Sequence, residues 1–170
     1  MVSPVEQIPL LSQEVWERQA RRDHGGLQVV WNLLDVVVDP EIPVLSLWEL
    51  GVLQDVQWDD GMIVISITPT YSGCPAIEVM EQDIRQCLSQ AGYNRLRVER
   101  CLTPVWGTHF MDEAAKEKLR QFQVAAPGAL ACPNCGSANV AQISEFSSTA
   151  CKSLYRCGDC QEPFDYFKPI

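Results

Sequence analysis

Residues 62–92 read MIVISITPTYSGCPAIEVMEQDIRQCLSQAG, and this stretch decides which fold the chain adopts. In its first part isoleucine recurs at every second position, which predicts a half-buried strand. In its last part apolar residues recur every three or four positions from Ile77 to Ala91, which predicts an amphipathic helix. Cys74, set between a glycine and a proline, separates the two. A strand that leads directly into a helix indicates a mixed α+β layer.

The preceding sequence predicts a second strand that pairs with the first. Val52, Val56 and Trp58 fit one face of a strand, and Asp60-Gly61 is typical of a tight hairpin turn because both turn positions need positive φ. The segment DPEIPVLSLWELG at 39–51 is predicted to be an ordered loop, since its two prolines interrupt regular structure.

Further helices and one more strand are predicted on both sides. Ser12 is expected to cap a helix that ends near Arg22, and a second helical pattern runs to Val37. A third strand is predicted over 95–102, then an irregular segment, and then a short helix over 113–122. The predicted fold is a small α+β domain with a mixed three-stranded sheet and helices packed mainly on one side.

The C-terminal part carries two cysteine pairs, CPNC at 132–135 and CGDC at 157–160. Two residues between thiolates let a tight turn direct both sulfurs at one ion, and two such turns complete a tetrahedron. A segment this short cannot bury a sufficient core by itself. The spacing therefore predicts a structural zinc β-ribbon, with zinc ligands Cys132, Cys135, Cys157 and Cys160.

Other readings of these cysteines stay open at this stage. Iron in a four-thiolate site, an iron–sulfur cluster and redox chemistry of a CxxC pair share the same residues. Cys151 is left over from the pattern: it could replace one ligand, stay free beside the site, or pack in a core. Gly136 and Gly158 are expected to provide backbone freedom in the two turns.

The expected organisation has four parts: an N-terminal helical extension at 1–24, the α+β domain at 25–123, a linker at 124–131 and the zinc ribbon at 132–170. The linker is inferred from its small residues, proline and glycine.

The composition limits which classes of function are possible. A formal net charge of −9 over 170 residues argues against nucleic acid as a partner, because phosphate neutralisation needs clustered Lys and Arg. No apolar run approaches the length of a membrane span, and the N-terminus lacks the features of a signal peptide. The sequence therefore predicts a cytoplasmic protein without a membrane partner.

Among the cysteines outside the two CxxC pairs, Cys74 has the sequence neighbours that most favour a functional thiol. It precedes Pro75, which suits the first turn of a helix, and the amides and dipole there are expected to stabilise a thiolate. Gly73 leaves room for a partner or an ion. The alternative is a small apolar cap. Cys87 belongs to the apolar stripe of its helix and is expected to pack, whereas Cys101 stays undecided.

A cysteine nucleophile normally needs a general base. The chain offers His24 and His109, and no pattern places either beside Cys74. Asp39 and Glu41 could serve acid–base or metal chemistry, or only capping and turn contacts.

Three segments resemble, in order and spacing, the family of metal–sulfur cluster assembly factors typified by SufT: DPEIPVLSLWELG (39–51), TPTYSGCPA (68–76) and TPVWGTHFMDEAAKEKL (103–119). With the added ribbon and its closing EPFDYFK, the chain is similar to the small accessory proteins encoded with the phenylacetyl-CoA epoxidase of aerobic phenylacetate degradation. The resemblance covers nearly all of residues 25–170.

The resemblance implies an accessory factor, not an enzyme, that assembles or delivers iron–sulfur clusters on client proteins. The implied partners are subunits of the epoxidase, which performs ring 1,2-epoxidation, including its iron–sulfur reductase. Carried over by position, Cys74 is the functional thiol, with Asp39, Glu41 and Thr70 lining its pocket. The implied cofactors are a structural zinc and a transient iron–sulfur cluster or iron. His109 stands where the family often has an acidic residue, so its role stays open.

Two alternative functions remain: a thiol transferase that uses Cys74 covalently, and a passive zinc-ribbon adaptor that bridges oxygenase subunits. The client and the oligomeric state, including a homo-oligomer, stay open.

Overall fold

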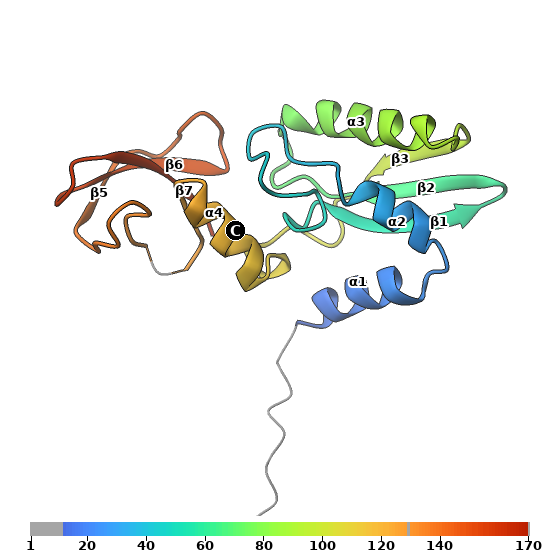
Figure 1. Ribbon diagram of the computed structural model, residues 1–170, viewed down its shortest axis with the longest axis horizontal. Coiled ribbons are helices and arrows are strands. Elements are labelled where there is room, and N and C mark those ends of the chain that lie inside the picture. Colours follow the sequence, from blue (N-terminus) through green and yellow to red (C-terminus); the bar gives the residue numbers. More distant parts are fainter. Residues whose placement is uncertain (1–11, 129, 170) are drawn as a thin grey trace, which may run out of the picture.

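The structure, a computed structural model, describes residues 12–128 and 130–169. The first eleven residues of the expected N-terminal extension therefore lie outside the described part. The chain forms an α+β domain followed by a ribbon of antiparallel strands, and helix α4 lies between the two (Figure 1). This is the predicted fold class, a mixed three-stranded sheet with packed helices and a C-terminal cysteine-bearing ribbon.

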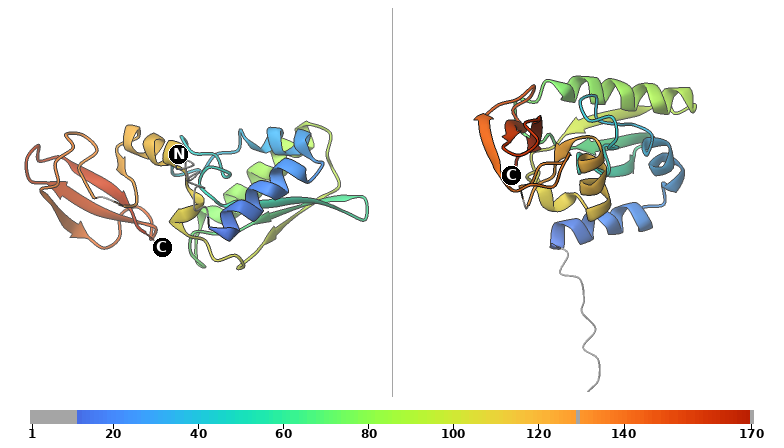
Figure 2. Two further views of the ribbon diagram at one scale, coloured as in Figure 1. Left: turned by 90° about the horizontal axis from the view of Figure 1, so that it is seen from below. Right: turned by 60° about the vertical axis from the view of Figure 1, so that its left-hand side comes forward.

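The first sheet has the order β1-β2-β3, with strands Leu53–Asp59, Met62–Ile67 and Leu96–Arg100. β1 and β2 form the predicted antiparallel hairpin, and β3 runs parallel to β2. Ile63, Ile65 and Ile67 are buried on one face, whereas the opposite face carries an ion pair of 2.7 Å between Arg97 and Glu99. The helices gather on the apolar face, as seen edge-on in Figure 2.

Four α-helices surround or extend this sheet: α1 (Gln13–His24), α2 (Gln28–Leu34), α3 (Ala76–Gln90) and α4 (Glu113–Gln121). The Ser12 hydroxyl accepts a hydrogen bond of 3.4 Å from the Val15 N–H, and the Asp112 carboxylate accepts one of 2.7 Å from the Ala115 N–H. Both residues are the predicted caps, because a short polar side chain satisfies an amide that the helix leaves unpaired.

The loop at 39–51 contains no regular element, as its prolines predict, but it is firmly held. The Trp106 indole donates a hydrogen bond of 3.0 Å to the Leu50 carbonyl. Arg18 of α1, 3% exposed, donates to the carbonyls of Trp48 and Leu53 and places its guanidinium 3.5 Å from the centre of the Trp48 ring. These contacts fix the position of the loop, including its first residues, Asp39 to Ile42.

The second sheet has the order β4-β7-β6-β5, with strands Val124–Ala125, Pro163–Phe167, Lys152–Cys157 and Val140–Ser144. β5, β6 and β7 form the antiparallel ribbon, and the predicted closing strand is β7. β4 occupies the start of the expected linker and pairs in parallel with β7. The 3-10 helix η1 (Thr108–Phe110) precedes α4.

The ribbon is continuous with the main hydrophobic core. Phe167 of β7, 1% exposed, and the buried Cys151 belong to the same cluster as the isoleucines of β2. The Phe167 ring lies 5.6 Å from the Trp106 ring, measured between centroids. A smaller cluster around Cys132, Cys157 and Phe164 lies inside the ribbon.

Trp58 lies on the same strand face as Val56, as expected, since Val56 pairs with Ile65 and Trp58 with Ile63. Its side chain is nevertheless 61% exposed, because it lies beside the hairpin turn at the end of the strand. One local prediction is wrong. The second helix ends at Leu34 and does not reach Val37, since Val38 instead forms an isolated bridge with Ser46. β-branched valines favour this extended backbone over the helix.

Among the described residues, no helix combines the length and the apolar character that crossing a membrane requires.

Gly51 is predicted to be essential for the loop at 39–51. Its φ is +82°, and an added Cβ would collide with the Cβ of Phe110. Gly51→Ala should lower the free energy of unfolding by about 3 kcal/mol through backbone strain and overpacking, as measured by urea denaturation. The matched control is Gly92→Ala, where φ is +91° but no atom lies within 4 Å of the added Cβ; it should cost about 1 kcal/mol. Equal costs for both variants would contradict the steric argument.

Candidate functional site

Four cysteines of the ribbon form one compact group. The sulfur atoms of Cys132, Cys135, Cys157 and Cys160 all lie within 4.8 Å of one another. Cys132 and Cys160 are 3.6 Å apart between sulfurs, as are Cys135 and Cys157. Four sulfurs bound at ~2.3 Å in a tetrahedron are separated by ~3.8 Å. The arrangement fits a single four-coordinate metal ion.

Backbone groups support this arrangement. The N–H groups of Asp159 and Cys160 point at the Cys157 sulfur from 3.4 and 3.5 Å. Gly136 has the expected positive φ of 75°. Gly158 does not; an added Cβ would lie 2.5 Å from the Asn139 amide nitrogen, so the Asn139 side chain would have to move. The left-handed residue of the second turn is Gln161, with φ 65°.

A second site is a narrow hollow between the α+β domain and the ribbon. Asp39, Glu41, Thr70 and Cys74 line it together, and so do residues from the ribbon. In Figure 1 the loop between β5 and β6 reaches toward the segment that precedes β1. The hollow has a volume of ≈ 10 Å³, about the minimum for one water molecule.

The local sequence places Cys74 directly before helix α3. Pro75 is the N-cap residue, the Cys74 carbonyl accepts a hydrogen bond of 3.4 Å from the Ile77 N–H, and the Cys74 N–H donates one of 3.2 Å to the Tyr71 carbonyl. The thiol is therefore fixed by the backbone on both sides, and it is partly buried.

The expectation of an acidified thiol at this helix end is wrong. Burial raises the pKa of Cys74 above its usual value, and the negative charges of Asp39 and Glu41 raise it further. The amides of Ala76 and Ile77 lower this pKa, but they do not outweigh the burial. Without a bound cation, Cys74 is a neutral thiol at neutral pH.

Asp39 is the buried carboxylate of the hollow, with 5% of its surface exposed. Its Oδ1 accepts hydrogen bonds from the N–H groups of Glu41, at 2.9 Å, and Ile42, at 2.7 Å. Burial raises the pKa of Asp39 despite these two bonds. Among the described residues, Oδ2 has no hydrogen-bonding partner, so one oxygen is available to a ligand.

Two further residues singled out by sequence are not brought into this hollow. Gly73 is adjacent to Cys74 in the chain but does not line the hollow. His109 lies in η1, where its Nε2 is 3.1 Å from a carboxylate oxygen of Glu14 in α1. The structure therefore places no imidazole beside Cys74 within the described part, since His24 ends α1 and is exposed.

Sequence reasoning missed the contribution of the ribbon to this hollow. Thr149, Cys151 and Phe167 of the ribbon line it beside Cys74. The only sequence signal was that Cys151 was left over once the four-cysteine pattern was complete. Its neighbours come from segments more than 70 residues away, so only the tertiary structure reveals the pairing. Cys87, by contrast, packs as expected on α3 and points its thiol at the Leu33 carbonyl, 3.2 Å away.

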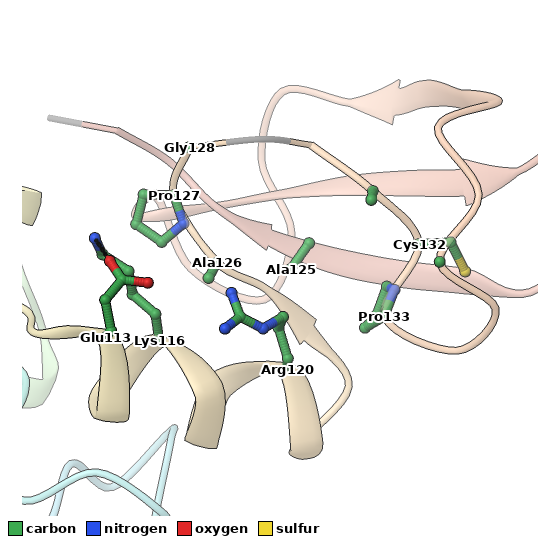
Figure 3. A pocket seen from close by; sticks show the side chains of 11 residues that line it. Glu113, Lys116, Arg120, Ala125, Ala126, Pro127, Gly128, Cys132 and Pro133 are labelled. Atoms are coloured by element: carbon green, nitrogen blue, oxygen red, sulfur yellow. Dashed lines mark hydrogen bonds and ion pairs between the residues drawn. The ribbon is translucent and has the colours of Figure 1, made fainter.

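A wider cleft lies along α4, the segment 125–128 and the ribbon (Figure 3). Its charged residues are already paired: Lys116 with Glu113 at 2.7 Å, and Arg120 with Glu117 at 2.8 Å. Its one thiol, Cys132, belongs to the four-cysteine group. The narrow hollow around Cys74 is therefore a better candidate for a functional site than the larger cleft.

Comparisons with known proteins match both parts of the chain. The model of a PaaD zinc beta ribbon domain matches residues 116–168, and that of an iron–sulfur cluster assembly protein matches residues 27–98. A protein of Escherichia coli (strain K12), described as the D subunit of 1,2-phenylacetyl-CoA epoxidase, is 44% identical over 152 residues, which cover 83% of this chain and 92% of the relative.

Two more distant similarities cover only part of the chain. An Fe-S protein maturation auxiliary factor of Porphyromonas gingivalis is 32% identical over 90 residues, 52% of this chain and 85% of that protein. The crystal structure of DUF59, a domain of unknown function, from Bacillus anthracis aligns with a TM-score of 0.50 and 27% identity, covering 61% of this chain and 95% of that one.

The environment of Cys74 predicts how fast it is alkylated. Because Asp39 raises the pKa of Cys74, Asp39→Asn should lower that pKa and increase the rate of alkylation by iodoacetamide at mildly alkaline pH about threefold to tenfold. Peptide mass spectrometry measures the rate at each cysteine. Cys87 is the internal control, because burial alone raises its pKa. A rate at Cys74 that stays unchanged would show that the Asp39 charge does not reach the sulfur.

Proposed function

Because the chain belongs to the family of the 1,2-phenylacetyl-CoA epoxidase D subunits, the PaaD family, we propose that it is an accessory factor of phenylacetate degradation that supports iron–sulfur cluster assembly or maturation. The client in this proposal is a component of the phenylacetyl-CoA epoxidase, the oxygenase that forms the ring 1,2-epoxide. That component is the iron–sulfur reductase subunit, because it needs a cluster.

One observation carries the proposal: Cys74 lies in a hollow with the carboxylates of Asp39 and Glu41, and among the described residues neither a carboxylate nor an imidazole forms a hydrogen bond with its sulfur. A thiol activated for covalent catalysis needs a base within hydrogen-bonding reach. A thiol beside carboxylates is instead suited to hold a metal ion, which neutralises the group and takes the place of its proton. This favours metal handling over thiol transfer, and it supports a non-catalytic role.

The four-cysteine group supports a second, structural metal. Cys132, Cys135, Cys157 and Cys160 hold zinc in this proposal, because a closed tetrahedral set of four thiolates leaves no open position for a substrate. The inner cluster of the ribbon is small, so the metal supplies the folding energy that the core lacks. Iron or an iron–sulfur cluster is bound only transiently, at Cys74.

The partners in this proposal are proteins of the cytoplasm. The formal net charge of −9 disfavours a nucleic-acid surface and suits contact with a partner that offers basic residues.

Zinc binding is predicted to depend on the exposed ligand Cys135 as strictly as on the buried ones. The purified protein should contain one zinc per chain by elemental analysis. Cys135→Ser should release it, because one thiolate of the tetrahedron is lost while packing is hardly disturbed. Cys101→Ser, at a partly buried thiol outside the group, is the matched control and should keep the zinc. Full zinc retention in Cys135→Ser would refute the assignment.

Cys74→Ser is predicted to abolish maturation while leaving the protein folded. The epoxidase components are expressed with the wild-type protein, with Cys74→Ser, or without either, and iron and sulfide are measured per reductase subunit. With Cys74→Ser the cluster content should fall to the level found without the protein, although a pull-down still recovers the complex. Cys87→Ser serves as the control and should leave the cluster content intact, since Cys87 lies outside the hollow.

The alternatives give different results. A covalent adduct on Cys74 of the wild-type protein, absent from Cys74→Ser, would replace the proposal by a thiol transferase. An unchanged cluster content in Cys74→Ser would leave only a passive adaptor.

A further inference from the structure

Cys151 is a second thiol in the hollow of Cys74, and it comes from the other part of the chain. It is 8% exposed and lies outside the four-cysteine group. It lines the same hollow as Cys74, Asp39 and Glu41, from the side of the ribbon. The two thiols therefore line one small space, and each comes from a different part of the chain.

The ribbon holds Cys151 in a defined position. The Thr149 hydroxyl lies 3.2 Å from the Cys151 sulfur, and the Cys151 carbonyl accepts a hydrogen bond of 2.9 Å from the Lys168 N–H. The loop before it is closed by a bond of 3.0 Å from the Ser147 N–H to the Lys152 carbonyl. Phe167, beside Lys168, is anchored in the main core. A thiol fixed in this way is pre-positioned as a ligand.

Simple packing does not explain this environment. A buried cysteine that only fills space behaves as a small apolar group and suits apolar neighbours. Cys151 instead shares its hollow with Glu41 and the buried Asp39, and burying a carboxylate beside two thiols is costly without a compensating cation. Lys152 is the cation that acts favourably on Asp39, but its ammonium is held 2.9 Å from an oxygen of Asp165.

We propose that Cys74 and Cys151 together bind one thiolate-preferring divalent metal ion, with Asp39 Oδ2 as a further ligand. The inference rests on the proposed role of Cys74 and adds that the ribbon supplies half of the thiolate pair. Two thiols lose two protons to solvent as the ion binds, and no electron is transferred. Thiolate and carboxylate donors together suit ferrous iron, the class of ion that the proposed function requires.

The size of the hollow fits an ion and not a preassembled cluster. A volume of ≈ 10 Å³ leaves space for one small species. Among the described residues only the four ribbon cysteines have donor atoms all within 4.8 Å of one another. Binding at Cys74 and Cys151 therefore includes a side-chain rotation that draws the donors together. This site is looser than the four-cysteine site, which suits an ion that must leave again.

The experiment uses the full chain with its zinc in place, under anaerobic conditions. The protein is titrated with Co²⁺, which serves as a spectroscopic substitute for ferrous iron. The near-ultraviolet sulfur-to-cobalt charge-transfer band increases with the number of thiolates bound. The wild-type protein should bind one Co²⁺ beyond the zinc, with the intensity of two thiolates. Cys151→Ser should halve this intensity and weaken binding at least about tenfold. Cys87→Ser is the matched control and should titrate like the wild-type protein.

The outcomes separate this inference from the proposed function. If Cys74→Ser abolishes the extra Co²⁺ while Cys151→Ser leaves intensity and affinity unchanged, the shared site is overturned and the role of Cys74 stands. If neither variant changes the titration, both fail.

A measurement on the wild-type protein guards against a misfolded variant. Co²⁺ should protect both Cys74 and Cys151 from alkylation, while leaving Cys87 as reactive as before. Protection of Cys74 alone would also overturn the inference.

Discussion

The structure depends on one contact, the packing of Phe167 against Trp106 with 5.6 Å between ring centroids. Phe167 belongs to the ribbon, and Trp106 belongs to the α+β domain, where its indole N–H binds the Leu50 carbonyl. The contact therefore connects the ribbon sheet to the loop at 39–51 that carries Asp39. Because Phe167 is 1% exposed and lines the hollow, truncating it would leave a cavity where the ribbon meets the α+β domain.

This connection explains why a ribbon is appended to an assembly domain. In the proposed arrangement, a metal ion bound by four thiolates stabilises the ribbon from within, while Phe167 and Cys151 join the core of the neighbouring domain. The ribbon is thus rigid where it meets the hollow. A rigid wall places a ligand more accurately than a mobile loop does. In this arrangement the structural metal acts on the second site indirectly, through the position of Cys151.

Local patterns predicted most of the fold. The alternation in β2, the Asp60-Gly61 turn, the helix after Cys74 and the two CxxC pairs each specify a local conformation, and the structure confirms all of them. The exposure of Trp58 was not predictable, because Trp58 shares a strand face with the buried Val56 and differs from it only in lying beside the hairpin turn. Sequence could not predict that Cys74 and Cys151 line one hollow either. Their proximity arises because aromatic side chains pack the ribbon against the α+β domain, and no sequence spacing indicates it.

The electrostatics of the hollow indicate how an ion held there is released. Burial and the neighbouring acids raise the pKa values of both Cys74 and Cys151, so protons compete with metal at these sulfurs more strongly than at ordinary cysteines. The ribbon group instead consists of four cysteines whose sulfurs lie within 4.8 Å of one another, which is a closed set for one tetrahedral ion. In our proposal, the ribbon group retains its ion and the hollow exchanges one. A factor that transfers iron to a client needs this difference in binding strength, because a site as tight as the structural one would keep its cargo.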